Sequence, residues 1–286
     1  MTASRTEISK PEPSHDAPST REVVSPPLLD LVDVEKTYAT LDGERIIALS
    51  PTDLQVKAGE FICIVGPSGC GKTTLLNLIS GLIRPSGGEI RFRGVPNEGP
   101  SAEIGIVFQK PVLLAWRSVI ENVMLPIEVM NLRPRQQFQE KARQLLATVG
   151  LAGFENRYPR ELSGGMQQRA AIARTLVYES SLLLMDEPFA ALDAMTREEL
   201  NLELMRIWKL TGRTILFVTH NIPEAVLLSD RVVVMTPRPG KIKAVVAVPL
   251  ERPRTLELMG TARFGDIANN IRSLLYGTGQ TQGQGA

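Results

Sequence analysis

Cysteine, long apolar runs and net charge are all scarce in this chain of 286 residues. Its two cysteines, Cys63 and Cys70, are too few for a disulfide framework, which fits a reducing compartment. No apolar run approaches the roughly 20 residues that a membrane-spanning helix needs. The formal net charge is +1, so composition gives no electrostatic case for binding nucleic acid. The remaining mixture, 43% hydrophobic and 22% charged residues, is typical of a soluble globular protein.

The two ends of the chain differ in composition from its middle. Residues 1–27 are rich in Pro, Ser and Thr and lack hydrophobic periodicity, and residues 277–286 consist mainly of Gly, Gln and Thr. Such segments cannot bury enough apolar surface to offset the entropy of ordering. Both are therefore expected to be disordered tails.

The pattern between the tails predicts an α/β fold. Alternating segments at 28–38 and 44–60, on either side of a turn at Asp42-Gly43, predict antiparallel strands. Unbroken apolar runs such as 61–66 and 182–186 alternate with helical patterns, which indicates a parallel sheet covered on both faces. Residues from about 118 to 178 are helical in pattern and predict a helical insert in this core.

The stretch "GPSGCGKTT", Gly66–Thr74, carries the strongest chemical signal. It fits the pattern G-x-x-x-x-G-K-[ST] between a predicted strand and a predicted helix. The glycines let backbone amides curl around phosphates, Lys72 reaches the outer phosphates, and Thr73 can offer its hydroxyl to Mg²⁺. The motif predicts a nucleoside-triphosphate site built from Gly66, Pro67, Ser68, Gly69, Cys70, Gly71, Lys72, Thr73 and Thr74.

Two adjacent acids end the predicted buried strand "LLLMDE", residues 182–187. The carboxyl end of a strand is where α/β sheets place ligands. Asp186 is expected to hold the metal, directly or through water, and Glu187 to polarise an attacking water. The alternative is a pair of solvated loop residues, which a phosphate loop in the same chain disfavours.

Single polar residues follow two other predicted strands. Gln109 ends "IGIVFQ" and leads into the helical insert, so its amide can ligate Mg²⁺ or orient water and still move with that insert. His220 ends "TILFVTH", and a strand end beside the phosphates favours a contact to the γ-phosphate. Either residue could instead be an ordinary polar group at the surface.

The stretch "ELSGGMQQRAAIARTL", residues 161–176, predicts a helix whose first turn carries almost no side chain. Ser163 suits the N-cap position. Gly164 and Gly165 each cost about 1 kcal/mol of helix propensity relative to alanine. Bare amides at a helix start form an anion site. Because the chain already has a phosphate loop, the question is whose phosphate this second site binds.

Together these elements resemble the ATP-binding-cassette ATPases. The resemblance covers residues 28–250 and rests on "GPSGCGKTT", Gln109, "LSGGMQQR", "LLLMDE", "ALD" at 191–193 and His220, of which "LSGGMQQR" is the family's signature. It implies a P-loop NTPase core, a parallel sheet flanked by helices, with an antiparallel β subdomain and an inserted α-helical subdomain at about 110–180. A helical extension at 251–276 would follow. The implied cofactors are ATP and Mg²⁺.

In that family two nucleotide domains pack head to tail, and the signature helix of one caps the γ-phosphate held by the other. The resemblance therefore implies a second copy of this chain as partner. Its trans contacts would come from Ser163, Gly164, Gly165 and Gln167, with Asp193 at the same dimer seam. Tyr38 matches the aromatic residue that stacks on adenine, although its approximate spacing also suits an ordinary strand residue.

The same resemblance bears on the cellular role. Relatives that act on DNA, RNA or ribosomes often have two cassettes, coiled-coil insertions or basic arms, and half-exporters typically carry fused membrane helices. This sequence has one cassette and no basic run. The expectation is a peripheral ATPase on the cytoplasmic face of the cell membrane, bound to integral permease subunits with a separate substrate-binding protein. No nucleic-acid partner is expected, but action on nucleic acid or ribosomes is the alternative.

The segment 110–126 points to the kind of transporter. Trp116 and Arg117 are residue types that anchor interfaces, so a permease helix could dock there; alternatively, Trp116 is buried in the core of the insert. "LLAWRSVIENV" looks like the nitrate, sulfonate and taurine importer group, with Ala115 in place of the usual proline. Members of that group also end with a helix like 263–275 and lack a regulatory β domain. A small anion is the implied substrate, and an importer for another substrate class is the other possibility.

Overall fold

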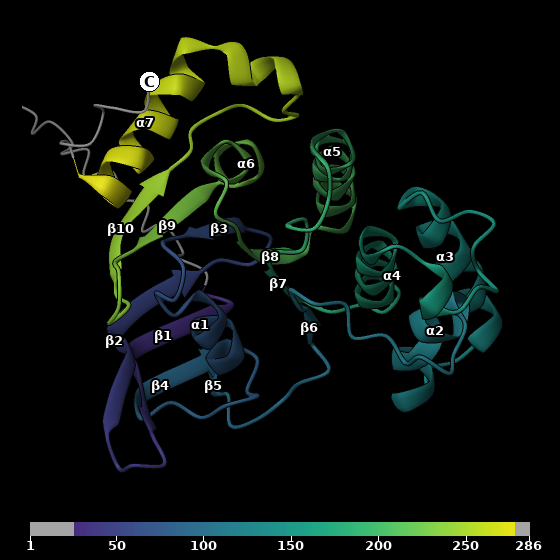
Figure 1. Ribbon diagram of the computed structural model, residues 1–286, viewed down its shortest axis with the longest axis horizontal. Coiled ribbons are helices and arrows are strands. Elements are labelled where there is room, and N and C mark those ends of the chain that lie inside the picture. The colour runs from purple at the N-terminus through teal and green to yellow at the C-terminus, as the bar shows by residue number, and fades with distance from the viewer. Residues whose placement is uncertain (1–25, 278–286) are drawn as a thin grey trace, which may run out of the picture.

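Residues 26–277 are described by the computed structural model, whose elements form two sheets and a separate group of helices (Figure 1). The predicted tails, 1–27 and 277–286, lie almost wholly outside these residues and stay predictions. No helix within 26–277 is long and apolar enough to cross a membrane.

The amino-terminal sheet is antiparallel and has the strand order β2-β1-β4-β5. Its strands are β1 (Leu29–Ala39), β2 (Arg45–Val56), β4 (Gly87–Phe92) and β5 (Val95–Pro96). β1 pairs with β2 from Leu29 opposite Val56 to Ala39 opposite Arg45, as the alternation predicted. The apolar side chains of this sheet pack with helix α1 (Lys72–Ile79) in one of the two core clusters.

The second sheet carries the chemistry and has the order β10-β9-β3-β8-β7-β6. The strands β3 (Phe61–Val65), β6 (Ile104–Val107), β7 (Leu182–Asp186), β8 (Thr214–Val218) and β9 (Arg231–Met235) are parallel. The last strand, β10 (Ile242–Ala247), pairs antiparallel with β9 and was not predicted. It is an edge strand in which exposed residues alternate with half-buried ones, although residues 244–248 are all apolar.

Three helices follow β6 and precede β7, and they form the group that stands apart in Figure 1. They are α2 (Val119–Val129), α3 (Arg135–Thr148) and α4 (Gly164–Leu176). α2 starts with a capping box in which Ser118 and Glu121 satisfy each other's backbone amides. These helices occupy the stretch where the sequence predicts a helical insert.

Three further helices lie along the central sheet: α7 (Ala262–Tyr276) beside β9 and β10, α6 (Ile222–Leu228) beside β3, and α5 (Ala194–Thr211) between α6 and α4 (Figure 1). Short 3₁₀ turns lie at Pro159–Glu161 and Leu256–Gly260. Arg254 is buried, and its guanidinium donates to the carbonyls of Val226, Leu227 and Ser229 at the end of α6. Burial lowers the pKa of Arg254 to about 10. This capping joins the segment before α7 to the core.

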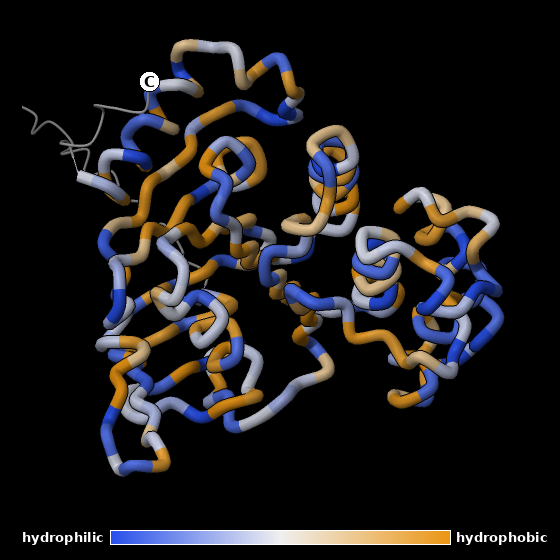
Figure 2. Tube along the Cα trace, in the orientation of Figure 1, coloured by the Kyte–Doolittle hydropathy of each residue, from blue (hydrophilic) through white to orange (hydrophobic). Residues whose placement is uncertain are grey.

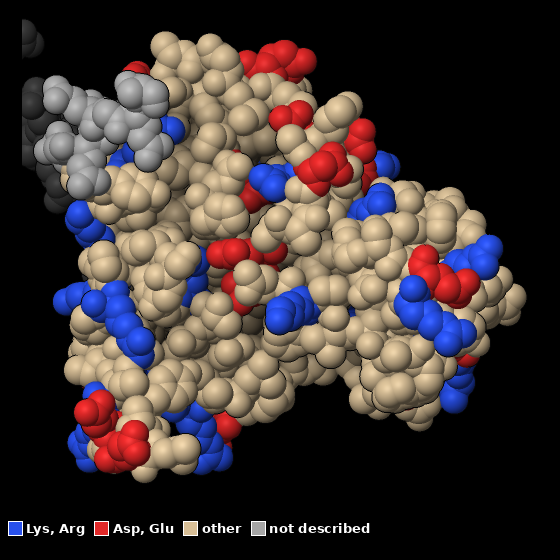
Figure 3. Space-filling view, viewed as in Figure 1, with Lys and Arg blue, Asp and Glu red and all other residues tan. Residues whose placement is uncertain are grey.

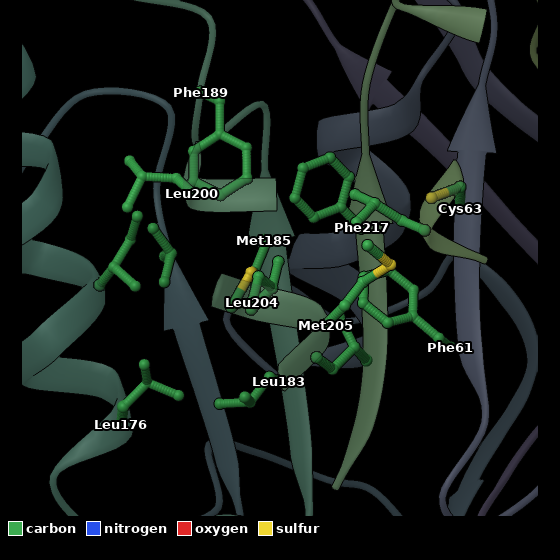
Figure 4. Close-up of a cluster of buried hydrophobic side chains, with 14 of the residues drawn as sticks. Phe61, Cys63, Leu176, Leu183, Met185, Phe189, Leu200, Leu204, Met205 and Phe217 are labelled. Carbon is green, nitrogen blue, oxygen red and sulfur yellow. The ribbon is translucent and has the colours of Figure 1, made fainter. Parts of the chain in front are cut away.

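The larger core cluster combines residues of the central sheet with residues of helices α2, α3, α4, α5, α6 and α7. Phe217 packs against Phe189 with ring centroids 5.5 Å apart and against Phe61 at 6.2 Å (Figure 4). The hydrophobic residues concentrate along the sheet strands in Figure 2, whereas the helices of the insert alternate in hydropathy. Every residue of β3, β7 and β8 is buried, and the polar residues that follow these parallel strands come together at one edge of the sheet, where the site lies.

Candidate active site

Four neighbouring parallel strands end at one edge of the central sheet, and the predicted residues follow them there. The phosphate loop follows β3, His220 follows β8, Asp186 and Glu187 end β7, and Gln109 follows β6. A cavity of about 380 Å³ opens at this edge. It is lined by Tyr38, Ala48, Ser68, Gly69, Gly71, Lys72, Thr73, Thr74, Gln109, Asp186, Glu187 and Arg238.

The phosphate loop has the conformation that its glycines permit. Gly69 and Gly71 have φ of +74° and +98°, in the left-handed region that favours glycine. Lys72 begins α1, and its Nζ donates to the carbonyls of Gly66 at 2.9 Å and Pro67 at 3.1 Å. The lysine is therefore folded over the loop, with its charge inside the ring of backbone atoms that would hold a phosphate.

The β9–β10 turn supports the loop from behind. A Cβ added to Gly240 would lie 1.9 Å from the carbonyl oxygen of Cys70, so only glycine fits this contact. The thiol of Cys70 is buried and does not line the cavity. Arg238, in the same turn, lines the cavity together with Ala48, and the sequence predicted neither. No motif marks them, because the packing of β10 beside β9 is what brings Arg238 to the site.

The residues expected at the metal lie together. The hydroxyl of Thr73 donates to Oδ2 of Asp186 at 2.8 Å. Burial raises the pKa of Asp186, and the hydrogen bond from Thr73 opposes that rise. A hydroxyl and a carboxylate are hard oxygen donors of the kind Mg²⁺ prefers. Residues 26–277 contain no group of three or more His, Cys, Asp or Glu side chains suited to a metal, so the further ligands would be Gln109, which lines the same cavity, together with water and phosphate oxygens.

Side chains that follow β6, β8 and β3 all approach the carboxylate of Glu187. Its Oε2 accepts from Nε2 of Gln109 at 3.3 Å and lies 3.5 Å from Nδ1 of His220, while Oε1 lies 4.0 Å from Nζ of Lys72. Its backbone has φ of +46°, a conformation that non-glycine residues adopt rarely and that is often found at functional sites. The structure thus brings Gln109, Glu187 and His220 into contact distance.

The start of α4 lies outside this cavity. Ser163 is the N-cap, and its hydroxyl accepts from the amide of Met166. Gly164 is exposed, and a Cβ added to it would meet no atom within 4 Å. None of the signature residues is among the cavity's lining residues. Within one chain, therefore, the bare helix end and the phosphate loop do not meet in the cavity.

The other two residues predicted for the dimer seam, Gln167 and Asp193, both make side-chain hydrogen bonds within their own chain. Nε2 of Gln167 donates to the carbonyls of Pro159 and Leu162, so this side-chain amide is used within its own chain. Asp193 is exposed and caps α5, with Oδ1 accepting from the amide of Thr196 at 3.0 Å, and this hydrogen bond lowers its pKa. A Cβ on Gly165 would lie 2.7 Å from Leu192, which places the Asp193 loop beside the start of α4.

The two aromatic residues singled out in the sequence, Tyr38 and Trp116, are both exposed. Tyr38 is 40% exposed and lines the cavity, as its expected adenine contact requires, with Nζ of Lys36 lying 5.3 Å from its ring centroid. Trp116 is 75% exposed, so the interpretation that it is buried in the core of the insert is wrong. Arg117 instead pairs with Glu128 on α2 at 2.6 Å.

A phosphate loop, a strand-end acid pair and a helical insert on a two-sheet core define a nucleotide-hydrolysing cassette, and comparisons with known proteins agree. The family model described as ABC transporter matches residues 49–190. An ABC transporter ATP-binding protein of Methanocaldococcus jannaschii is 51% identical over 213 residues, which are 74% of this chain and 79% of that protein. The chain therefore belongs to the ABC transporter ATP-binding proteins, which hydrolyse ATP.

Other relatives and structures match nearly as widely. The taurine import ATP-binding protein TauB of Yersinia pestis is 45% identical over 74% of this chain and 82% of its own length. TauB of Roseobacter denitrificans is 43% identical over 77% of this chain and 82% of its own length. A dimeric post-hydrolysis state of the ATP-binding cassette MJ0796 bound to ADP and Pi has a TM-score of 0.69 and 32% identity, covering 78% of this chain and all of that one. The predicted cassette fold is confirmed.

Proposed function

We propose that this chain is the ATP-hydrolysing subunit of an importer for a small anion of the nitrate, sulfonate or taurine type, working as a head-to-tail dimer on permease subunits. One observation carries the dimer: the bare start of α4 is exposed and lies outside the chain's own phosphate cavity. A helix end built to bind an anion then needs a phosphate held by a second copy. The dimeric cassette of MJ0796 and the TauB relatives support this proposal.

The residues at this edge of the central sheet suit ATP hydrolysis in a site that two copies of the chain share. Glu187 would orient a water for in-line attack on the γ-phosphate, with Lys72 and His220 offsetting the charge that develops. Ser163 and the amides of Gly164 and Gly165 from the partner copy would close over the same phosphate. Thr73, Asp186 and Gln109 would hold Mg²⁺, which supplies further charge neutralisation on the phosphate oxygens when bound.

The segment around Gln109 offers a surface for the permease. Phe108, Val112 and Trp116 are 36%, 54% and 75% exposed. Exposed apolar side chains that gather on a surface are typical of interaction sites, and tryptophan is a frequent interface anchor, which supports a docking role for this segment. Because the segment begins beside Gln109, a partner seated on it could move that side chain relative to Glu187. Figure 3 shows charges of both signs distributed over the face it draws, without one continuous basic stripe.

The test is reconstitution of the chain with the permease subunits that co-purify with it from membranes and with their binding protein. Trp116→Ala is expected to lose co-purification with the permease while the purified variant still binds ATP. Leu210→Ala, which removes an equally exposed apolar residue at the far end of α5, is the matched control and should co-purify normally. Uptake of taurine, an alkanesulfonate and nitrate into proteoliposomes then identifies the substrate. ATPase stimulation by DNA, RNA or ribosomes but not by the permease would contradict the proposal.

A further inference from the structure

Glu224 is a buried carboxylate for which the hydrolysis reaction as described has no use. It lies in the first turn of α6, four residues after His220, and is 6% exposed. Burial raises its pKa, and hydrogen bonds from Thr219 and Asn201 oppose that rise. An acid in such a place is retained at a cost in desolvation.

Both oxygens of Glu224 are held, and one of them holds the loop that carries His220. The hydroxyl of Thr219 donates to Oε2 at 2.5 Å and itself accepts from the amide of Asn221 at 3.0 Å. Oδ1 of Asn221 accepts from the amide of Glu224 at 3.0 Å. The residues immediately before and after His220 are thus both fixed to Glu224, whereas the exposed imidazole itself contacts Glu187.

The other oxygen reaches the helix that starts at the dimer seam. Nδ2 of Asn201, buried on α5, donates to Oε1 of Glu224 at 3.1 Å. One turn earlier on α5, Arg197 donates to the carbonyl of Leu192, the residue before the N-cap Asp193. Arg197, Glu224, His220 and Glu187 also share the walls of one small cavity. A continuous set of contacts therefore runs from His220 to Asp193.

We propose that Glu224 is a positioning residue that fixes His220 relative to α5 and so couples the γ-phosphate contact of one site to the Asp193 seam shared with the second copy. The inference rests on the proposed roles of Glu187, His220 and Asp193. Its physical basis is that α5 is one unbroken helix, so a buried hydrogen bond at Asn201 transmits displacement of its N-cap to the His220 loop. Glu224 itself is not among the residues lining the phosphate cavity.

Because Glu224 does not line the phosphate cavity, a coupling role and a merely structural role predict different effects of breaking its contact with Asn201. Loss of the Asn201–Glu224 contact should lower turnover and the cooperativity of ATP hydrolysis between two sites, because both depend on His220 and Asp193 moving together. It should leave the affinity of a single chain for ATP unchanged, because Lys72 and the phosphate loop are outside the network. A residue needed only for folding would lower thermal stability and ATP affinity together.

The experiment first replaces the side-chain amide of Asn201 and then restores a donor–acceptor pair between positions 201 and 224. Asn201→Asp puts a second carboxylate against Glu224 and removes the donor, so turnover is expected to fall at least tenfold and the Hill coefficient to approach one. Adding Glu224→Gln supplies a side-chain amide that can donate to the new carboxylate at 201. The double variant is expected to recover turnover to within about threefold of the parent chain. ATP affinity is measured by equilibrium binding and folding by thermal melting for all proteins.

The outcomes distinguish failure of the inference about Glu224 from failure of the proposed site. The inference is overturned if the double variant stays as slow as Asn201→Asp while melting like the parent chain, or if Asn201→Asp weakens ATP binding as much as it slows turnover. Glu187→Gln is assayed beside them. If Glu187→Gln turns over normally, the proposed site is wrong and the inference with it. If Glu187→Gln stalls but Asn201→Asp matches the parent, only the inference is wrong.

Discussion

Nε2 of Gln109 donates to Oε2 of Glu187 across 3.3 Å, and Nδ1 of His220 lies 3.5 Å from the same oxygen. Residues that follow β6, β7 and β8 thus share one carboxylate oxygen. Because the amide and the imidazole both approach Glu187, that carboxylate is held in one orientation at the edge of the phosphate cavity. A general base needs this kind of fixed geometry before its pKa matters.

Glu187→Gln should keep ATP binding and stall hydrolysis, because the amide preserves the shape and the contact from Gln109 but cannot polarise water. Turnover is expected to fall by about 10²–10⁴-fold, the usual contribution of a general base. With ATP present, the stalled protein should accumulate as a dimer on gel filtration. Glu198→Gln, an exposed acid on α5, is the control and should behave as the parent chain. Parent-rate turnover by Glu187→Gln would show that the base is another group.

Lys72→Ala should remove tight nucleotide binding. The Nζ that now donates to the carbonyls of Gly66 and Pro67 is the buried cation available to the outer phosphates. A hydrogen bond to a charged group contributes about 1.5–3 kcal/mol, which corresponds to a loss of affinity of roughly 10- to 100-fold. Isothermal titration with ATP measures this loss. Lys57→Ala, which changes an exposed lysine just before β3, should leave the affinity unchanged, and equal losses in the two variants would contradict the assignment.

The sequence predicts those site residues that lie next to one another in short motifs. Lys72, Thr73 and the Asp186-Glu187 pair lie in short motifs at strand ends, and parallel pairing then brings those ends together without further information. Arg238 lacked such a signal, because it reaches the cavity only through the pairing of β10 with β9. The apolar run at 244–248 is a strand signal, but residue type alone does not show that this strand pairs with β9 and so carries Arg238 to the cavity.

The sequence also does not predict which partners the long side chains contact. Arg117, which is expected at an interface, pairs with Glu128 within its own chain, and this contact depends on how the loop meets α2. The amide nitrogen of Gln167, which is expected at the dimer seam, donates to Pro159 and Leu162 within its own chain. The exposure of Trp116 depends on whether the insert closes over it, which residue type alone cannot decide.

Both thiols should be unreactive in the folded chain. Cys63 and Cys70 are buried, and burial raises the pKa of each. The thiolate is the reactive form, so a raised pKa leaves less of it at pH 8 than an exposed cysteine has. Ellman's reagent should therefore detect no rapidly reacting thiol in the native protein and two in guanidinium chloride. Rapid labelling of one thiol in the native chain would show that the P-loop region around Cys70 opens more readily than its packing against Gly240 implies.

Gly164→Ala should make the chain more stable and less active. An added Cβ at 164 meets no atom within 4 Å, and alanine is favoured over glycine in a helix by up to about 1 kcal/mol. The same methyl group would stand between the start of α4 and a phosphate held by the partner copy, so ATPase activity should fall. Thermal melting and steady-state ATPase assays measure the two effects on one preparation.

Gly265→Ala is the matched control for that change. It also lies near the start of a helix, α7, and an added Cβ there meets no atom within 4 Å. It should raise stability by a similar amount and leave ATPase activity at the parent level, because no phosphate is expected at α7. If Gly164→Ala were equally active, a methyl group would be tolerated at the seam and the close approach of this helix end to a phosphate would be wrong. Opposite changes in stability and activity at 164 alone would tie the bare first turn of α4 to nucleotide and not to folding.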